Sequence, residues 1–253
     1  MFQLSTIWFE GRSPHGEYRV VDVFYNRRPA RLLYGGGDSP QSALAFDDSA
    51  EMIFNYNQRF MEIAQSLDPK HILVIGGGAF TLPTALLKRF PDARIEAVEI
   101  DELLVNLSKR FFGLKDDPRL KVVVGDGRAY LEQTNNQYDL VVVDAFSEYS
   151  TPTSLLSKRA AELYSAVLAP GGVVAINFIS AYHVSRPDLA HDLKATFETS
   201  FEHVDIYPAD YSERIASSDN LVLVAGQSEP RLDYLQSVAL PGLEGVRGQI
   251  IND

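Results

Sequence analysis

The sequence predicts an α/β protein in which a mainly parallel sheet is covered by helices on both faces, with a small β-hairpin region ahead of it. From residue 72 onward, short aliphatic runs alternate with helical patterns, as expected of successive βαβ units. The aliphatic runs are almost unbroken, which is typical of strands that are buried on both faces. Three glycines follow the first run, at the end of the strand where such sheets bind ligands.

The middle of the chain is predicted to form parallel strands with helices between them. We expect strands at residues 72–75, 94–99, 120–124, 138–143 and 172–178. We expect the intervening helices near residues 82–90, 102–112, 127–132 and 158–167. A helix at 187–199 and strands at 203–207 and 220–225 follow. By analogy, an antiparallel strand pair at this edge completes the seven-stranded sheet of a Rossmann-like, class I methyltransferase-type fold.

The N-terminal region has a different pattern. Residues 18–34 contain two β-rich runs separated by residues 26–29, which predicts a hairpin, and glycines at 35–37 end it. Residues 49–66 place apolar side chains at helical spacings and predict a helix that packs on the main sheet. We therefore divide the chain into an N-terminal β-hairpin region (1–48), a Rossmann-like catalytic domain (49–228) and a C-terminal tail (229–253).

Composition and charge exclude several classes of function. The chain of 253 residues is 45% hydrophobic and 23% charged, as in ordinary globular proteins. Its net charge of -11 opposes nucleic-acid binding, because that affinity comes mainly from lysine and arginine. The absence of cysteine excludes disulfides, thiolate metal sites and cysteine nucleophiles, and the histidines show no metal-ligand spacing, so no metal is expected. With no membrane-length apolar run and no signal-peptide pattern, we expect a cytoplasmic protein without a membrane partner.

The turn after the first strand is rich in glycine. Ile75 is followed directly by Gly76, Gly77 and Gly78. Glycine at a strand-to-helix turn permits a positive φ and lets a ligand approach the backbone, while the helix N-terminus offers free N–H groups. By itself, this pattern also fits a turn that binds nothing.

The second strand ends in acidic residues about twenty positions after the glycines. A carboxylate at the position of Glu99 can accept hydrogen bonds from both hydroxyls of a ribose, with Ile100 beside it. Glu99 could instead cap the following helix, but Asp101 can do that equally well and would leave Glu99 free. We therefore expect Glu99 and Ile100 to contact a nucleoside.

Two further strand ends carry aspartates. Asp126 lies between Gly125 and Gly127, where its carboxylate can accept the exocyclic amine of adenine or, alternatively, cap the next helix. Asp144 ends the fourth strand. Because the carboxyl ends of parallel strands meet at one edge of a sheet, all these loops should surround one ligand. A dinucleotide would require another glycine early in the first helix, where Ala79 stands, so an adenosyl sulfonium compound is favoured over NAD.

Through six stretches between about Gly36 and Ala225, the chain resembles the spermidine synthase family. The stretches are VIGGGAFTLP, AVEIDELLV, FGLKDDPRL, VVVGDGRAYL, YDLVVVDAFS and LAPGGVVAINF. The resemblance implies an aminopropyltransferase of polyamine biosynthesis, in which decarboxylated S-adenosylmethionine donates an aminopropyl group to a small-molecule amine. It assigns Asp144 as the base that removes the amine proton, Glu99 to the ribose, and Asp126 with Gly127 to adenine. The N-terminal hairpins resemble those that join family subunits, which implies a homodimer.

The predicted amine pocket contains both matches to and departures from the family. Gln41 and Tyr56 would line it. The family's second acidic residue, three positions after the catalytic aspartate, is replaced by Ser147, with Glu148 next to it. We include Ser147 and Glu148 in the predicted substrate site.

The first loop departs most from the family. Spermidine synthases carry there an aspartate that holds the donor's terminal ammonium, whereas this sequence has Ala79 and Phe80. The chain therefore resembles a spermidine-synthase-like branch that lacks this aspartate. Two alternatives stay open: a methyl or aminocarboxypropyl transferase that uses intact S-adenosylmethionine, and a non-catalytic homologue that binds a nucleoside.

Overall fold

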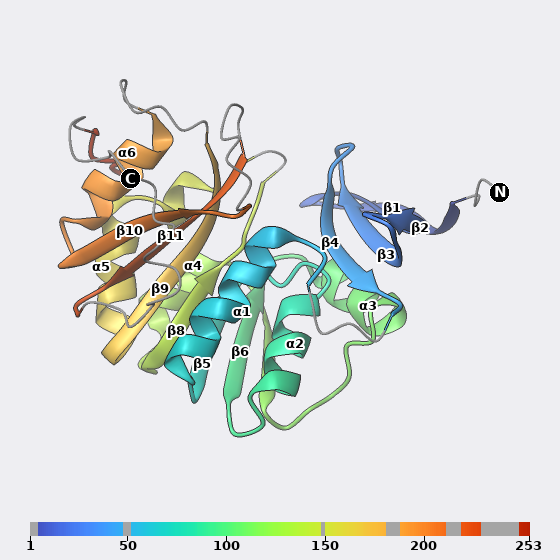
Figure 1. Cartoon of the computed structure of the whole chain (residues 1–253), viewed down its shortest axis with the longest axis horizontal. Helices are drawn as coiled ribbons and strands as arrows, with labels where there is room; N and C mark the ends of the chain where they lie inside the picture. Colours follow the sequence, from blue (N-terminus) through green and yellow to red (C-terminus); the bar gives the residue numbers. More distant parts are fainter. Residues whose placement is uncertain (1–4, 48–51, 148–149, 181–187, 211–218, 229–247) are drawn as a thin grey trace.

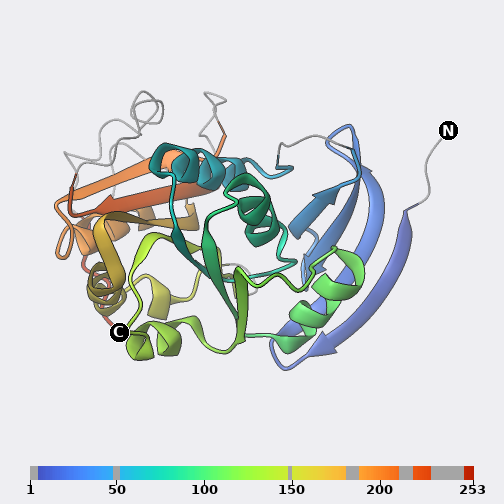
Figure 2. The ribbon, with the colours of Figure 1, turned by 90° about the horizontal axis from the view of Figure 1, so that it is seen from below.

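The computed structural model describes residues 5–47, 52–147, 150–180, 188–210, 219–228 and 248–253. Its strands form two separate sheets, one of four strands and one of seven. Figure 1 shows the smaller, N-terminal sheet beside the larger one, and Figure 2 shows helices on both sides of the larger sheet. The smaller sheet ends at Ala45 and the first helix begins at Asn55. The domain boundary predicted after residue 48 falls between them, outside the described residues, and stays a prediction.

The smaller sheet is an antiparallel meander in the order β1-β2-β3-β4. The predicted hairpin of residues 18–34 is confirmed as β2 (Gly16–Tyr25) and β3 (Arg28–Gly35). Its turn is only two residues long, because Asn26 and Arg27 both have positive φ, at 47° and 63°. This conformation matches the right-handed twist of the two strands.

Two strands of this sheet were not predicted from the sequence. In β1 (Thr6–Ser13) no residue is buried, and Ile7 and Trp8 are among the most exposed large apolar side chains described. Its half-buried positions are Phe9, Gly11 and Ser13, so the sequence lacks the alternation of apolar and polar residues that identifies a strand. The other strand, β4 (Pro40–Ala45), follows the glycines of residues 35–37 and begins at a proline, so its sequence is typical of a turn.

The larger sheet confirms the predicted class I methyltransferase-type fold. Its strands lie in the order β10-β11-β9-β8-β5-β6-β7, with β11 antiparallel to both of its neighbours and parallel pairs among the others. The strands are β5 (His71–Ile75), β6 (Arg94–Glu99), β7 (Leu120–Val124), β8 (Tyr138–Val143), β9 (Leu168–Ser180), β10 (His203–Pro208) and β11 (Asp219–Gly226).

Two apolar clusters cover the two faces of this sheet. One is shared with α1 (Asn55–Leu67) and α2 (Thr81–Arg89). The other is shared with α5 (Lys158–Val167) and α6 (Leu189–Phe197), next to the short helices α4 (Gly127–Gln133) and η1 (Thr153–Leu155). In the described part of the chain, none of the helices has both the length and the apolar character that crossing a membrane would require.

The predicted helix of residues 49–66 begins later than expected. Phe54 precedes α1 in an extended conformation, and α1 starts at Asn55. The ring of Phe54 stacks on Tyr56 and meets the edge of Tyr25 in the smaller sheet. The apolar character of Phe54 therefore reflects packing between α1 and the smaller sheet, and not a position inside the helix.

A third apolar cluster joins the two sheets. Tyr18, Val20 and Leu33 of the smaller sheet pack on Ala79 and on the helix α3 (Glu102–Phe111). The guanidinium of Arg31 strengthens the junction, because it pairs with Asp22 and also donates to the backbone oxygen of Phe111 at 2.7 Å. The smaller sheet is thereby fixed over the carboxyl end of β6.

The last residues, for which the sequence gives no signal, pack on the larger part of the chain. The backbone N–H of Lys158 donates to the oxygen of Ile251 at 2.7 Å. Arg128 of α4 pairs with Asp253 at 2.8 Å. Residues 248–253 therefore contact helices that lie next to the predicted site loops.

Candidate active site

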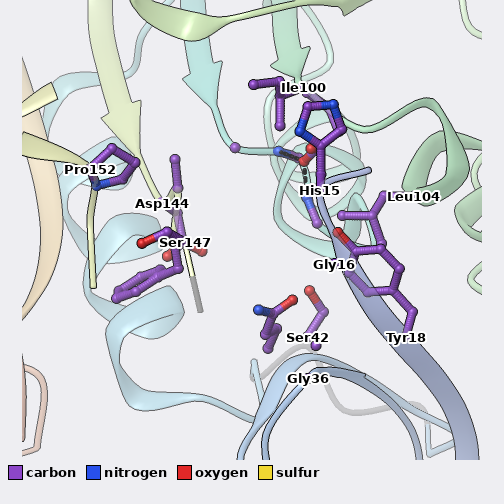
Figure 3. Close-up of a pocket in the computed structure, with 18 of the residues that line it drawn as sticks. His15, Gly16, Tyr18, Gly36, Ser42, Ile100, Leu104, Asp144, Ser147 and Pro152 are labelled. Carbon is purple, nitrogen blue, oxygen red and sulfur yellow. Dashed lines mark hydrogen bonds between the residues drawn. The ribbon is translucent and has the colours of Figure 1, made fainter. Parts of the chain in front are cut away.

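One cavity of about 860 Å³ lies between the carboxyl ends of the parallel strands and the N-terminal sheet. Figure 3 shows Asp144, Ser147 and Pro152 on one side of it, and His15 and Tyr18 from the smaller sheet on the other. The cavity brings together every predicted site residue that the structure describes: Gln41, Tyr56, Gly76, Gly77, Gly78, Glu99, Ile100, Asp126, Gly127, Asp144 and Ser147. Glu148 lies outside the described residues.

The glycine turn brings β5 and β8 into close contact. Gly76 has a φ of 89°, and a Cβ at this position would overlap the backbone oxygen of Asp144. The N–H of Asp144 donates to the oxygen of Ile75 at 2.8 Å. Only glycine fits both the conformation and the space. The turn therefore fixes the position of Asp144 as well as the approach to the cavity.

The carboxylate of Glu99 holds the glycine turn. Its side chain is 5% exposed. One oxygen accepts the backbone N–H groups of Gly77 and Gly78 at 2.8 and 2.9 Å, and the other accepts that of Asp101 at 3.0 Å. Burial raises the pKa of Glu99, and the three backbone donors offset part of this rise. Asp101 caps α3 through Leu103, as predicted, but Glu99 is engaged by the backbone rather than free.

Asp126 caps the following helix. Its Oδ1 accepts the N–H of Ala129 at 2.8 Å, which is the alternative that the sequence left open. Asp126 still lines the cavity with Gly127, and Ile100 adds an apolar side chain that is 44% exposed. The contact of Asp126 with adenine stays a prediction.

Asp144 lies at the end of β8 beside a buried amide. Its Oδ1 accepts a hydrogen bond from Nδ2 of Asn177 at 2.9 Å. Burial raises the pKa of Asp144 to about 7, and the bond from Asn177 offsets part of the rise. A carboxylate that gains and loses its proton near neutral pH suits a general base.

The predicted amine pocket lies next to this carboxylate. The hydroxyl of Tyr56 donates to the backbone oxygen of Gln41 at 3.2 Å. Burial raises the pKa of Tyr56, and the negative charge of Asp144 adds to the rise. The hydroxyl of Ser147 donates to the oxygen of Ser150 at 2.9 Å. Tyr56 is therefore close enough to Asp144 for the two groups to interact electrostatically. The hydroxyl of Ser147, in contrast, is engaged in a hydrogen bond within its own loop.

The residues that replace the family's first-loop aspartate point away from the cavity. Ala79 and Phe80 are 1% and 0% exposed, and neither lines the cavity. Ala79 packs against Tyr18 and Val20 of the smaller sheet, and Phe80 belongs to the core under α1 and α2. This part of the turn therefore supplies apolar packing.

Several cavity residues were missed by sequence reasoning. The hydroxyl of Ser13 donates to Asp101. Burial raises the pKa of Tyr18, and its hydrogen bond to Asp101 adds to the rise. These residues approach only because the two sheets pack together, so no local pattern reveals them. Asn177 did leave a signal, since it is a polar residue inside the aliphatic run of β9. The described residues contain no group of three or more side chains suited to a metal ion.

A family model and several known proteins match this chain. A model of the spermine/spermidine synthase domain matches residues 50–215. The chain is 28% identical over 227 residues to polyamine aminopropyltransferase 2 of Pseudomonas aeruginosa, covering 86% of this chain and 62% of that protein. It is 30% identical over 179 residues to putrescine N-methyltransferase 2 of Nicotiana attenuata, covering 68% of this chain and 46% of that protein. The chain thus spans about half to three fifths of the length of these relatives.

The fold is also similar to a solved structure. A probable spermidine synthase from Corynebacterium glutamicum superposes with a TM-score of 0.75 at 22% identity. The match covers 90% of this chain and 81% of that protein. At this identity, the likeness supports the fold alone.

The contact between the glycine turn and β8 predicts a difference between two glycines with positive φ. Gly76→Ala should lower the free energy of unfolding by about 1–3 kcal/mol more than Gly113→Ala, because a Cβ at 76 overlaps backbone. Gly113 has a φ of 74°, and a Cβ there would meet nothing within 4 Å. Urea unfolding of both variants measures the difference. Equal losses would mean that the turn can move away from Asp144 without cost.

Burial of Asp144 predicts a pH-dependent gain of stability in Asp144→Asn. The raised pKa means that the folded protein binds this proton more tightly than the unfolded chain, so stability falls as pH rises from about 4 to 7. Asparagine cannot ionise. The variant should gain on the order of 3 kcal/mol at pH 8, and the gain should shrink toward pH 4. Unfolding at several pH values tests this, with Asp116→Asn, a fully exposed carboxylate, as the control. A gain that does not depend on pH would contradict it.

Proposed function

Because the chain belongs to the spermine/spermidine synthase family, we propose that it is an aminopropyltransferase that moves an aminopropyl group from decarboxylated S-adenosylmethionine to a small-molecule amine. The observation that carries the proposal is the pairing of two carboxylates in one cavity. Glu99 lies at the glycine turn, where a nucleoside would bind, and Asp144 lies at the end of β8 beside Tyr56. The relative from Pseudomonas aeruginosa, named a polyamine aminopropyltransferase, supports the same activity.

The proposed reaction is a displacement at the carbon beside a sulfonium. The nitrogen lone pair of the acceptor forms the new C–N bond, the C–S bond breaks, and its electron pair stays on sulfur, so methylthioadenosine leaves as a neutral thioether. The proton released from nitrogen passes to Asp144. Little acid catalysis is needed, and most of the rate comes from holding the partners in line.

Asp144 is suited to keep the acceptor nitrogen unprotonated. A free alkylamine has a pKa near 10.4, so in water it is almost entirely an ammonium ion at neutral pH. Burial brings the pKa of Asp144 to about 7, which makes it a far better proton acceptor than an ordinary aspartate. We therefore propose Asp144 as the catalytic residue, with Gln41, Tyr56 and Ser147 near the amine.

A second candidate is methyl or aminocarboxypropyl transfer from intact S-adenosylmethionine. Ala79 and Phe80 favour it, because they stand where the family has an aspartate and therefore supply no carboxylate that would repel the carboxylate of the intact donor. The relative from Nicotiana attenuata, named a putrescine N-methyltransferase, supports an amine acceptor for this reaction as well. The cytoplasmic location and the homodimer expected from the sequence stay predictions.

Product analysis distinguishes these candidates. The protein is incubated with either donor and a panel of diamines and polyamines, and the nucleoside product is measured by mass spectrometry. Release of methylthioadenosine from the decarboxylated donor is the expected result. Release of S-adenosylhomocysteine from the intact donor would favour methyl transfer, and methylthioadenosine from the intact donor would favour aminocarboxypropyl transfer. A nucleoside that binds without turnover would favour the non-catalytic alternative.

Two variants separate chemistry from binding. Asp144→Asn should lower kcat by about 100-fold or more, because it removes the base, while the affinity for methylthioadenosine changes little. Glu99→Gln should weaken that affinity by about 10-fold or more, because it removes a charged hydrogen-bond acceptor and disturbs the glycine turn. Calorimetry gives the affinities, and Asp116→Asn is the control. If Asp144→Asn keeps full turnover, Asp144 is not the base.

A further inference from the structure

Asn177 is a buried amide that none of the sequence patterns assigned to the site. It lies in β9, is 0% exposed, and lines the cavity. Its Nδ2 donates to Oδ1 of Asp144 at 2.9 Å, and its backbone oxygen accepts the hydroxyl of Thr151 at 3.0 Å. Its side-chain carbonyl Oδ1 has no hydrogen-bond partner among the residues that the structure describes.

An unpaired buried carbonyl needs a physical explanation. Leaving such a group without a partner destabilises a folded protein, and an aliphatic side chain would suit the rest of β9 better. Its neighbours on the same face of the strand are apolar: Ala175, which is buried, and Ile179, which also lines the cavity. An amide at position 177 is therefore less favourable for the stability of the strand than an aliphatic side chain would be, which points to a role other than packing.

The two ends of the amide match the two protonation states of its neighbour. An ionised carboxylate can only accept hydrogen bonds, whereas a protonated one also donates through its O–H. A primary amide offers an N–H donor and a carbonyl acceptor, and a half-turn about its Cβ–Cγ bond exchanges their positions. In the structure, the donor end faces Asp144, which is the arrangement that suits the carboxylate.

We propose that Asn177 is a positioning residue that holds Asp144 in both of its protonation states, donating to the carboxylate before proton transfer and accepting from the carboxylic acid afterwards. The inference rests on the proposed function, in which the acceptor nitrogen forms its bond to carbon and passes its proton to Asp144. The amide then turns, and the carbonyl that was unpaired accepts the new O–H. Burial brings the two states of Asp144 close in free energy near neutral pH, so both need a partner.

Other groups near Asp144 also influence its protonation. Tyr56 faces it from α1, and the charge of Asp144 contributes to the raised pKa of the tyrosine. Glu99 lines the same cavity at the end of β6. On the β5 side, Asp144 meets the glycine backbone at Gly76. Asn177 is the group on β9 that bonds the carboxylate.

The donor half of the proposal predicts a change in the pKa of Asp144. Asn177→Leu keeps the size of the side chain but removes both bonds, the one to the carboxylate and the one from the carboxylic acid. Because the bond to the charged carboxylate is about twice as strong as a neutral one, the loss disfavours the carboxylate more, and the pKa should rise by about 1 unit. It is measured in the ligand-free protein by NMR titration of 13C-labelled aspartate, with Asp144→Asn identifying the signal. Thr151→Val is the matched control, because it removes a buried bond to the backbone of Asn177 without touching Asp144, and it should leave the pKa unchanged.

The acceptor half predicts a rotation. Contacts between the Nδ2 protons of Asn177 and the Cβ protons of Asp144 should be seen by NMR above the midpoint of the titration and lost below it. An Asp144 pKa in Asn177→Leu within about 0.3 units of the wild-type value would overturn the proposal. Contacts that persist at low pH would overturn it as well.

Kinetics connect the pair to the reaction. The acidic limb of the kcat/KM profile should move in Asn177→Leu by the same amount as the pKa of Asp144, with KM for the amine changed less than about 3-fold. If the pKa of Asp144 changes in Asn177→Leu but the acidic limb of the kcat/KM profile does not, Asn177 has no role in proton transfer. The NMR measurements need no substrate, so a protein that fails to turn over would refute the proposed function and still test the pairing.

Discussion

The three hydrogen bonds to the buried carboxylate of Glu99 are the interaction on which the rest of the site depends. They join the glycine turn after β5 to the end of β6. Glu99 is itself almost fully buried, so these bonds connect the turn to the core of the sheet, and the carboxylate fixes the shape of the turn before any ligand arrives. A carboxylate has about four acceptor positions. Three are used by the backbone, so about one stays available to a ribose hydroxyl, and a second hydroxyl would have to share an acceptor that the fold already uses.

The two carboxylates of the cavity differ through their surroundings. Burial raises the pKa of both. Glu99 is surrounded by backbone donors that favour its ionised form, while Asp144 receives the bond from a neutral amide and lies beside Tyr56. The same chemical group thus serves as a fixed anchor at Glu99 and has, at Asp144, the pKa that the proposed role as proton acceptor requires.

The central sheet and most of the cavity could be predicted from the sequence, because their strands are aliphatic runs buried on both faces. The helix cap by Asp101 followed from local spacing in the same way. What could not be predicted depends on packing between distant segments. The half-buried face of the edge strand β1 carries one large apolar side chain, that of Phe9. Phe54 packs on Tyr25 of the smaller sheet and not inside α1. The contacts of Ser13 and Tyr18 with Asp101 exist only once the sheets have docked.

The wall that the smaller sheet contributes to the cavity has a thermodynamic consequence. Ser13, His15 and Tyr18 face the ligand space from one sheet, and Glu99 and Asp144 face it from the other. A molecule bound between them contacts both, so its binding free energy also strengthens the attachment of one sheet to the other, and a firmer attachment tightens binding by the same factor. A ligand that bridges the two sheets would make the β1–β2 turn and the cavity a single cooperative unit, and the exchange of the turn's amide hydrogens with solvent would then slow as the cavity fills.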